Sequence, residues 1–329
     1  MPTRPVVHIG IVTFNSLADL PQCFAGIRQQ TYPHIRISVL DNASVDESAD
    51  WVAANCPDVF LLRSPDNLGF GRGHNRIIGS LADGEYYMAL NPDVGLLPGY
   101  IEAVVNALES NLSAGWATGK LIQPDGHTLY SIGHALLRDG YAFNIGYGLP
   151  DRPDFNISRE VFGAPGAAVI FTDRLLAAKP VVFEEVMFLY AEDTDFDWAA
   201  RRQGWVCLYV AEAIAHHRGS QPKEALRVES LTNRYLSVFK NAYGVDLIFY
   251  NLPRIVLHVL LRCVITPRLG LRMAGRLIRL FPVMLGKRQK PVISRQDMHR
   301  WFRWSNEQPI EAYPSLMWRL RSFITRRKA

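Results

Sequence analysis

The sequence YYMALNPDV, residues 86–94, joins an apolar run to a polar turn. The run has the composition of a buried strand, and Asn91 and Asp93 follow where that strand ends. A turn accounts for both polar residues, because Asn-Pro and Pro-Asp are ordinary turn dipeptides. The alternative is that Asp93 holds a ligand at the carboxyl end of the strand, and the rest of the chain bears on that choice.

Segments typical of strands alternate with segments typical of helices through the first half of the chain. The strand candidates are β-branched and apolar: VVHIGIVTF (6–14), IRISVLD (35–41), VFLLRS (59–64) and YYMALN (86–91). This order predicts an α/β fold with a mostly parallel mixed sheet flanked by helices. In such sheets ligands bind beyond the carboxyl ends of the strands. Polar residues stand at three of these ends, in 13–15, 41–42 and 91–93, which favours a site over three unrelated turns.

A glycine-rich stretch, DNLGFGRGHN, covers residues 66–75. It fails the G-x-G-x-x-G pattern because position 74 is histidine, and the chain has no G-K-[ST] that would indicate a P-loop. What remains is a turn into a helix that could bring backbone N–H groups close to an anion. A plain strand-to-helix turn explains the stretch equally well.

Four acids cluster in YAEDTDFDW, residues 190–198. Carboxylates at a helix N-terminus offset the helix dipole and need no further role, but four exceed what one helix start needs. If the helix begins near Glu192, Asp193 and Asp197 share a face and Asp195 points away from both. Asp193 is the aspartate nearest the N-terminus of this helix, so we expect it to face the rim of the sheet; Asp195 competes for that position if the helix starts later.

A divalent cation is a candidate ligand of Asp93, because Mg²⁺ uses one or two protein carboxylates together with substrate phosphates. His216 or His217 could complete such a site if the metal is Mn²⁺. A single histidine is more often structural. The four cysteines have no metal-ligand or disulfide-framework spacing, and this pattern, with no signal peptide, indicates the cytosol.

The C-terminal region is basic, with 17 Lys and Arg against 3 Asp and Glu in residues 251–329. Such asymmetry points to nucleic acid or an anionic membrane surface. No apolar run reaches the ~20 residues of a membrane-spanning helix. We expect residues 250–290 to dock on the cytoplasmic face of the membrane; the alternative is a helical cap with its arginines in water. The expected stripe combines arginines with apolar neighbours: Arg268, Arg272, Arg276, Arg279, Leu271, Leu277, Ile278 and Phe281.

Several motifs in order resemble the bacterial family 2 glycosyltransferases of the GT-A fold, and most of all the branch with rhamnosyltransferases of cell-surface polysaccharide (such as O-antigen) assembly. The motifs are VTFN, LDNASVDES, DNLGFGRGHN, LNPDV, GA..VIF, F.YAEDTDFDWAARRQGW and AHHRGS. The resemblance covers about residues 7–240, so we expect a catalytic domain in 1–240 and a helical, basic, membrane-associated region in 241–329. It implies an inverting transferase whose donor is a dTDP- or UDP-sugar, with dTDP-rhamnose favoured. The implied acceptor is a glycan or a lipid-linked molecule. The implied cofactor is Mg²⁺ or Mn²⁺, and no nucleic acid is expected as a partner.

The resemblance also implies roles for individual residues. Asp193 is the expected catalytic base, and Asp93 and His216 are the expected metal ligands. The expected donor-binding residues are Thr13, Asn15, Asp41, Asn42, Ser44, Asn67, Gly69, Phe70, Asn75, Asn91 and Asp93. The expected acceptor residues are Gly166, Glu192 and Asp195. Two positions depart from the family pattern: Asn91 replaces the first acid of D-x-D, and FEEVMF (183–188) stands where FDE.FF is typical.

Two other classes of function compete with the transferase. One is a non-catalytic, membrane-associated scaffold whose sheet retains a nucleotide-binding shape. The weaker one is a glycoside hydrolase that uses two of the acids in 192–197.

Overall fold

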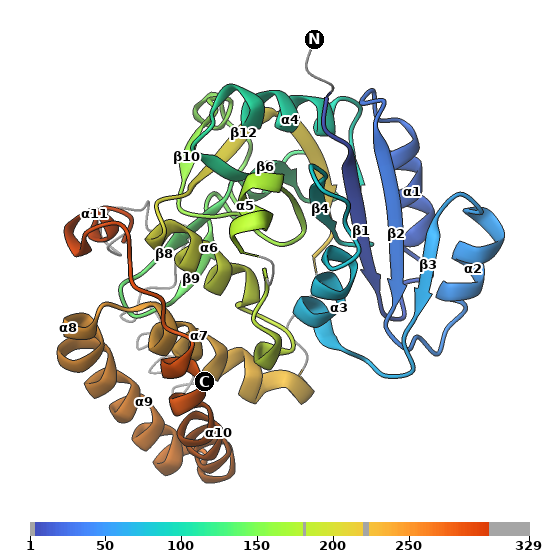
Figure 1. Ribbon diagram of the computed structural model, residues 1–329. Coiled ribbons are helices and arrows are strands. Elements are labelled where there is room, and N and C mark those ends of the chain that lie inside the picture. The colour runs from blue at the N-terminus through green and yellow to red at the C-terminus, as the bar shows by residue number, and fades with distance from the viewer. Residues whose placement is uncertain (1–3, 180–181, 220–223, 303–329) are drawn as a thin grey trace.

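The computed structural model describes residues 4–179, 182–219 and 224–302, and its centre is a ten-stranded sheet (Figure 1). The strand order is β10-β12-β6-β11-β4-β1-β2-β3, with β5 paired to β12 and β7 paired to β6. β1 to β4 are mutually parallel, β6 and β12 are parallel to each other, and β11 runs antiparallel between β4 and β6. The predicted mostly parallel mixed sheet is confirmed. The strands of this sheet are β1 (Val7–Thr13), β2 (Ile35–Asp41), β3 (Phe60–Arg63), β4 (Tyr86–Leu90), β5 (Val94–Leu96), β6 (Ala114–Ile122), β7 (Leu129–Ser131), β10 (Arg159–Val161), β11 (Ala168–Phe171) and β12 (Val206–His217).

Alternate residues of the central strands feed two cores, one on each face of the sheet. Val7, Ile9 and Ile11 of β1 lie in the first core, with apolar side chains of α1, α2 and α4. Tyr87 and Ala89 of β4 lie in the second, with side chains of α3, α5 and α6. Successive strand residues point to opposite faces, so a strand covered on both sides is apolar throughout. These helices are α1 (Leu20–Arg28), α2 (Ser48–Asn55), α3 (Gly69–Ile78), α4 (Tyr100–Ser110), α5 (Asp173–Ala178) and α6 (Glu192–Arg202).

The last strand of the sheet, β12, runs from Val206 through a shift of register between Val210 and Ile214 to His217. Its final part pairs His216 with Gly95 and His217 with Val94, so both histidines lie beside the turn that follows β4. The segment between β6 and β10 contains β7 and a separate two-stranded sheet of β8 (His134–Leu136) and β9 (Ala142–Asn144).

The C-terminal part is helical through residue 299, apart from its connecting turns, and has its own apolar core. Side chains of α6, α7, α9, α10 and α11 meet in this third core. The expected domain boundary at 240/241 falls at the end of α7, which packs against both α6 and α10. The elements are α7 (Arg227–Asn241), α8 (Gly244–Asp246), a π-helical turn η4 (Leu247–Asn251), α9 (Leu252–Ile265), α10 (Pro267–Gly286) and α11 (Arg295–His299).

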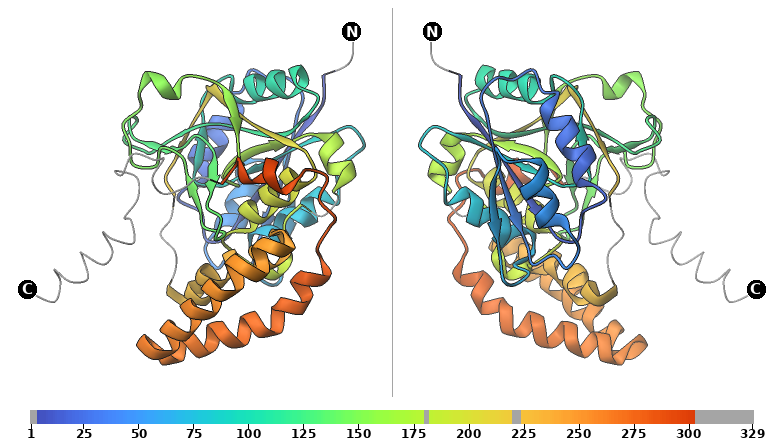
Figure 2. Two further views of the ribbon diagram at one scale, coloured as in Figure 1. Left: turned by 90° about the vertical axis from the view of Figure 1, so that its left-hand side faces the viewer. Right: turned by 90° about the vertical axis from the view of Figure 1, so that its right-hand side faces the viewer.

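Helices α9 and α10 form a hairpin that projects from the body (Figure 2). Gly270 allows the close approach, because a Cβ there would lie 2.3 Å from the backbone nitrogen of Cys263. One continuous helix, Gly244–Ile265, is 22 residues long and apolar enough to cross a membrane by length and composition. The apolar run itself is shorter, as expected, because Arg254, His258 and Arg262 interrupt it, but these residues do not end the helix. One such helix is weak evidence of a span by itself.

Candidate active site

The ends of β1 and β2 form the first part of the site. Thr13 pairs in register with Asp41, and the Asn42 N–H donates to the Thr13 carbonyl at 2.8 Å. Both side chains are buried, and within the described residues the Thr13 Oγ1 and Asp41 Oδ1 atoms have no hydrogen-bond partner. Buried polar atoms are nearly always paired, so an orphaned carboxylate oxygen at a strand end indicates a ligand that donates to it.

Asn15 and Ser44 brace the two loops that leave these strands. The Asn15 N–H donates to Ser44 Oγ at 3.0 Å, and Asn15 Oδ1 accepts from the Val45 N–H at 2.8 Å. Asn15 has a φ of 54°, a left-handed conformation that asparagine tolerates better than most residues. The two residues therefore tie the loops after β1 and β2 to each other at the carboxyl ends of these strands.

Asn42 organises the glycine-rich turn. Its Oδ1 accepts from the Leu68 N–H at 2.7 Å, and its Nδ2 donates to Asn67 Oδ1 at 2.9 Å. The Gly69 N–H donates to Asn67 Oδ1 at 2.9 Å, and the Phe70 N–H donates to the Phe188 carbonyl at 2.9 Å. Because these three N–H groups are used inside the protein, the first turn of α3 does not offer them to an anion. The turn instead fixes the position of the Phe70 ring.

Asn75 lies one turn further along α3 and holds a different segment. Its Nδ2 donates to the Phe183 carbonyl at 2.8 Å, and its Oδ1 accepts from the Phe183 N–H at 3.0 Å. These two bonds attach α3 to residues 183–188, the segment that departs from the family pattern. Asn75 is thus placed as a clamp on that segment.

Asp93 forms the part of the site that follows β4. Its Oδ1 lies 3.3 Å from Nε2 of His217, and the same turn is fixed by the Asn91 N–H, which donates to the Ala167 carbonyl at 2.8 Å. Burial raises the pKa of Asp93, but the hydrogen bond and charge of His217, a backbone hydrogen bond and the charge of Arg218 together outweigh it, and the net pKa lies below its ordinary value. The contact partner is His217, whereas His216, the metal ligand expected from the sequence, lines a cavity of about 240 Å³ beside Asp93.

This cavity has few cation ligands of its own. Among the described residues no group of three or more His, Cys, Asp or Glu side chains is arranged to hold a metal. The Nδ1 atoms of His216 and His217 have no partner in the described part of the chain. One ionised carboxylate with neighbouring imidazoles fits a cation whose remaining ligands come from phosphates.

A strained loop leads into α6. Phe188, Tyr190 and Ala191 all have positive φ, at 61°, 76° and 65°. Asn233 of α7 holds this loop by donating from Nδ2 to the carbonyls of Met187, Leu189 and Tyr190 at 2.8–2.9 Å. Left-handed conformations of residues other than glycine cost ~1–3 kcal/mol each and persist where the surroundings fix them. The loop therefore sets the direction in which α6 begins.

Asp193 stands in the first turn of α6 and is partly exposed. Its Oδ2 accepts from the Gly166 N–H at 3.2 Å, and its Oδ1 accepts from the Thr194 N–H at 2.7 Å. A Cβ on Gly166 would lie 2.8 Å from the Phe70 ring. Gly166, Phe70 and Asp193, which are far apart in sequence, thus meet at one point.

The neighbouring acids of α6 have other surroundings. Asp195 is fully buried and contacts Lys240 and Asn241 of α7, on the side away from Asp193. Glu192 is also buried, and its Oε2 has no partner within the described residues. Burial, reinforced by the charge of Asp193, raises the pKa of Glu192 well above its ordinary value.

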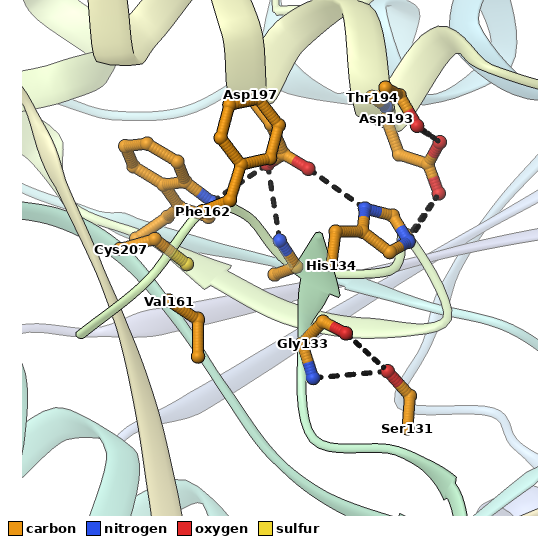
Figure 3. A network of polar contacts seen from close by, with 12 residues as sticks. Ser131, Gly133, His134, Val161, Phe162, Asp193, Thr194, Asp197 and Cys207 are labelled. Atoms are coloured by element: carbon orange, nitrogen blue, oxygen red, sulfur yellow. Dashed lines mark hydrogen bonds and ion pairs between the residues drawn. The ribbon is translucent and has the colours of Figure 1, made fainter. Parts of the chain in front are cut away.

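One polar residue of this region, His134, was missed by sequence analysis. His134 of β8 lies between Asp193 and Asp197 (Figure 3), with Nδ1 2.9 Å from Asp197 Oδ2 and Nε2 3.8 Å from Asp193 Oδ2. His134 stands in SIGHALL, which carries no motif, so only the three-dimensional contact reveals it.

Comparison with known proteins gives this geometry a family. Residues 8–157 match the profile of Glycosyl transferase family 2. Residues 8–157 are thus similar to a family 2 glycosyltransferase domain. It is similar to an N-acetylglucosaminyl-diphospho-decaprenol L-rhamnosyltransferase of Mycobacterium tuberculosis, with 27% identity over 235 residues that cover 65% of this chain and 76% of the relative.

Solved structures confirm the GT-A fold expected from the family resemblance. GalNAc-T7 with UDP, GalNAc and Mn²⁺ superposes with a TM-score of 0.57 at 11% identity, covering 71% of this chain and 48% of that one. A Pyrobaculum calidifontis mannosyltransferase with GDP-Man and Mn²⁺ gives 0.50 at 15% identity, covering 87% and 84%. S. aureus TarS 1–349 gives 0.50 at 12% identity, covering 86% and 87%. At these identities the likeness establishes the fold alone.

Proposed function

We propose that this family 2 glycosyltransferase inverts the anomeric centre of a nucleotide-diphospho-sugar as it transfers the sugar to a hydroxyl of a glycan or lipid-linked acceptor, in cell-surface polysaccharide synthesis. One observation supports this most strongly. The backbone of Gly166 and Ala167 contacts both Asp193 and the turn after β4, since Gly166 donates to Asp193 and Ala167 accepts from Asn91. The proposed base, Asp193, is thereby connected through two adjacent residues to the turn that carries Asp93, the carboxylate proposed to lie beside the diphosphate.

The nucleotide base belongs at Asp41. Its unpaired, buried Oδ1 is an acceptor for the N3–H of uracil or thymine. Thr13 lies beside it, and Asn15 and Ser44 tie together the loops that follow the two strands. The resemblance to a rhamnosyltransferase supports dTDP-rhamnose as the donor, with UDP-sugars as the alternative.

The diphosphate belongs beside Asp93. When bound, a Mg²⁺ or Mn²⁺ ion held by Asp93 and His216 would neutralise charge that develops on the leaving diphosphate. Asp93 is held in place by His217, and Asn91 fixes the turn through its backbone. The absence of a third protein ligand in the described residues fits a cation that takes its other ligands from the donor.

Asp193 acts as the general base on the acceptor. The acceptor oxygen forms its bond to the anomeric carbon while the bond from that carbon to the diphosphate oxygen breaks. The hydroxyl proton passes to Asp193, and the electron pair leaves with the nucleoside diphosphate. The bare Cα of Gly166 and the Phe70 ring border the acceptor side, and Glu192 closes it. Asp195 is left out of the acceptor site because it is buried against α7.

The α9–α10 hairpin belongs on the inner face of the cytoplasmic membrane, where a lipid-linked acceptor would lie. Arg268, Arg272 and Arg279 are exposed, and each basic residue near an anionic surface contributes about 1 kcal/mol. Exposed apolar side chains accompany them on the hairpin: Val256, Leu257, Leu260, Leu261, Val264, Ile265, Leu271, Ile278 and Val283.

The other residues of the expected stripe face inward. Arg276 donates to Thr232 Oγ1 and to the Val186 carbonyl, and Leu277 and Phe281 pack into the third core. The hairpin is thus both a cap on α7 and a carrier of an exposed amphipathic face. Arg254 and Arg262 within the 22-residue helix favour the membrane interface over the bilayer centre.

A donor screen tests the function. The purified protein is incubated with dTDP-rhamnose and a panel of UDP-sugars, with and without polyprenyl-diphosphate-linked sugars, and nucleoside diphosphate release is measured. Release that increases with acceptor supports transfer. A scaffold would release nothing, and a hydrolase would cleave glycans without any nucleotide.

A further inference from the structure

His134 is a buried imidazole beside the proposed base Asp193, and contacts with Gly163, Asp197 and Asp193 fix its position. Its side chain is 7% exposed, and its backbone N–H donates to the Gly163 carbonyl at 2.7 Å. A Cβ on Gly163 would lie 1.9 Å from Asp197 Oδ2, so only glycine leaves room for Asp197 to reach the ring. The absence of a side chain at Gly163 therefore permits the contact between Asp197 and His134.

Asp197 is in turn held by three donors. Its Oδ1 accepts from Trp116 Nε1 at 2.9 Å and from the Ala164 N–H at 3.2 Å, while its Oδ2 faces His134 Nδ1 at 2.9 Å. The side chain is completely buried. Burial raises the pKa of Asp197 to about 6, which leaves the carboxylate ionised at neutral pH. An ionised Asp197 fixes a proton on Nδ1 and directs Nε2 at Asp193.

The electrostatic surroundings favour a charged ring. Burial lowers the pKa of His134, but the carboxylates of Asp193 and Asp197 outweigh it, and the net pKa is raised above its ordinary value. The other charged or titratable groups around this trio are Glu192, Arg201, Cys207 and Tyr130. Of these only Arg201 is cationic, and it donates to the carbonyls of Val161 and Phe162.

We propose that His134 is a positioning residue for the transfer reaction: as an imidazolium anchored by Asp197, it holds the Asp193 carboxylate in its ionised form, with one face turned to the acceptor. The inference rests on the proposed role of Asp193 as base. Two backbone donors, the Gly166 N–H and the Thr194 N–H, then hold that carboxylate by hydrogen bonds, and His134 Nε2 faces it at ion-pair distance. A nearby cation favours the ionised form of a carboxylate, so the base stays competent at lower pH.

A titration that needs no turnover tests the coupling. Histidines labelled with ¹³C at Cε1 are followed by NMR against pH, and His134→Gln identifies the His134 signal. We expect His134 to titrate above the ~6.5 of an unperturbed histidine and Asp193→Asn to lower its midpoint by about one unit. Glu160→Gln removes a half-exposed carboxylate near the same region without contacting His134, and should leave the midpoint unchanged. A midpoint at or below the ordinary value that ignores Asp193→Asn overturns the proposal.

The pH dependence of transfer supplies the second test. His134→Gln should move the acidic limb of kcat/KM to higher pH by about one unit, because the base loses the neighbouring cation that favours its ionised form. Affinity for the nucleoside diphosphate should not change. A purely structural role for His134 would lower activity at every pH and leave the limb in place, which contradicts the proposal. If wild-type protein transfers no sugar while the NMR coupling is present, the proposed function fails and the coupling stands.

Discussion

The Gly166 N–H donates to Asp193 Oδ2 across 3.2 Å. This bond joins the loop before β11 to the first turn of α6, and it places the carboxylate beside the residue that follows Gly166, Ala167, which accepts from Asn91. In the proposed mechanism, this relationship holds the base at a fixed distance from the turn proposed to receive the diphosphate.

Gly166→Ala tests this relationship by steric means. The new methyl group would meet the Phe70 ring at 2.8 Å, so the ring or the loop must move. Since a displacement of about 1 Å costs up to ~10²-fold in rate, we expect kcat to fall ten- to a hundredfold with an unchanged circular dichroism spectrum. Gly275→Ala, where the methyl group would meet open space, is the control. A wild-type kcat for Gly166→Ala would show that the loop does not position the base.

Asp41→Ala removes the unpaired oxygen at the end of β2. A hydrogen bond to a charged group contributes ~1.5–3 kcal/mol, so dTDP or UDP should bind about ten- to a hundredfold more weakly in calorimetric titration. Asp58→Asn, at an exposed position between α2 and β3, is the matched control. Identical titration curves for Asp41→Ala and wild type would remove Asp41 from the site.

The cation requirement is tested at Asp93. Chelation should abolish transfer, and added Mg²⁺ or Mn²⁺ should restore it in wild-type protein but not in Asp93→Ala. Full activity in excess chelator would show that Asp93 acts without a cation. His217→Gln removes the contact that holds Asp93 in place but keeps His216, the proposed metal ligand, so it distinguishes positioning of Asp93 from direct binding of the cation. We expect a weaker apparent affinity for the cation with kcat largely retained.

Burial of Glu192 should make the free energy of unfolding depend on pH. Its folded-state pKa is raised, so its contribution to stability is fully present below the unfolded-state value of about 4.3 and is lost as pH rises through the folded-state value. The melting temperature of wild type should therefore fall relative to that of Glu192→Gln as pH increases from 5 to 9. Glu212→Gln, at an exposed position, should follow wild type throughout. Parallel curves for wild type and Glu192→Gln would contradict the assigned burial effect.

Membrane docking is tested on the exposed face of α9. Wild-type protein should sediment with vesicles that contain anionic phospholipid, and less so as salt increases. Leu260→Asp combined with Val264→Asp should abolish sedimentation, whereas Leu112→Asp, at an exposed leucine between α4 and β6, should not. Indifference of the wild type to such vesicles at physiological salt would end this part of the proposal. Release from native membranes by alkaline carbonate would separate docking from a spanning helix.

The sequence carried the alternation of strands and helices, and therefore the sheet and the edge on which Asp41 and Asp93 lie. Hydrophobic periodicity is a local property, so these elements could be predicted from the chain. Asp195 pointed away from Asp193, as helical geometry predicts, but its partner Lys240 could not be foreseen. His134, Asn233 and the pairing of Asp93 with His217 depend on contacts between segments that are distant in sequence. Arg276 is a similar case. The spacing of the arginines places it on one stripe of the helix, but the sequence does not show that Thr232 and Val186 contact it there.

The central claim is that Asp193 is the base, and the Asp193→Asn variant tests it most directly. Under saturating donor, nucleoside diphosphate release that depends on acceptor is measured for Asp193→Asn and Asp195→Asn, each corrected for the fraction folded. Losing a general base typically costs ~10²–10⁴ in rate, so Asp193→Asn should lose at least about a hundredfold while still binding the donor. Asp195→Asn should lower stability, because it removes one of the two buried carboxylates that contact Lys240 and leaves only Glu184, and should keep most of the rate per folded molecule. An Asp193→Asn protein that retains more than about a tenth of the wild-type rate while Asp195→Asn is inactive would contradict the account.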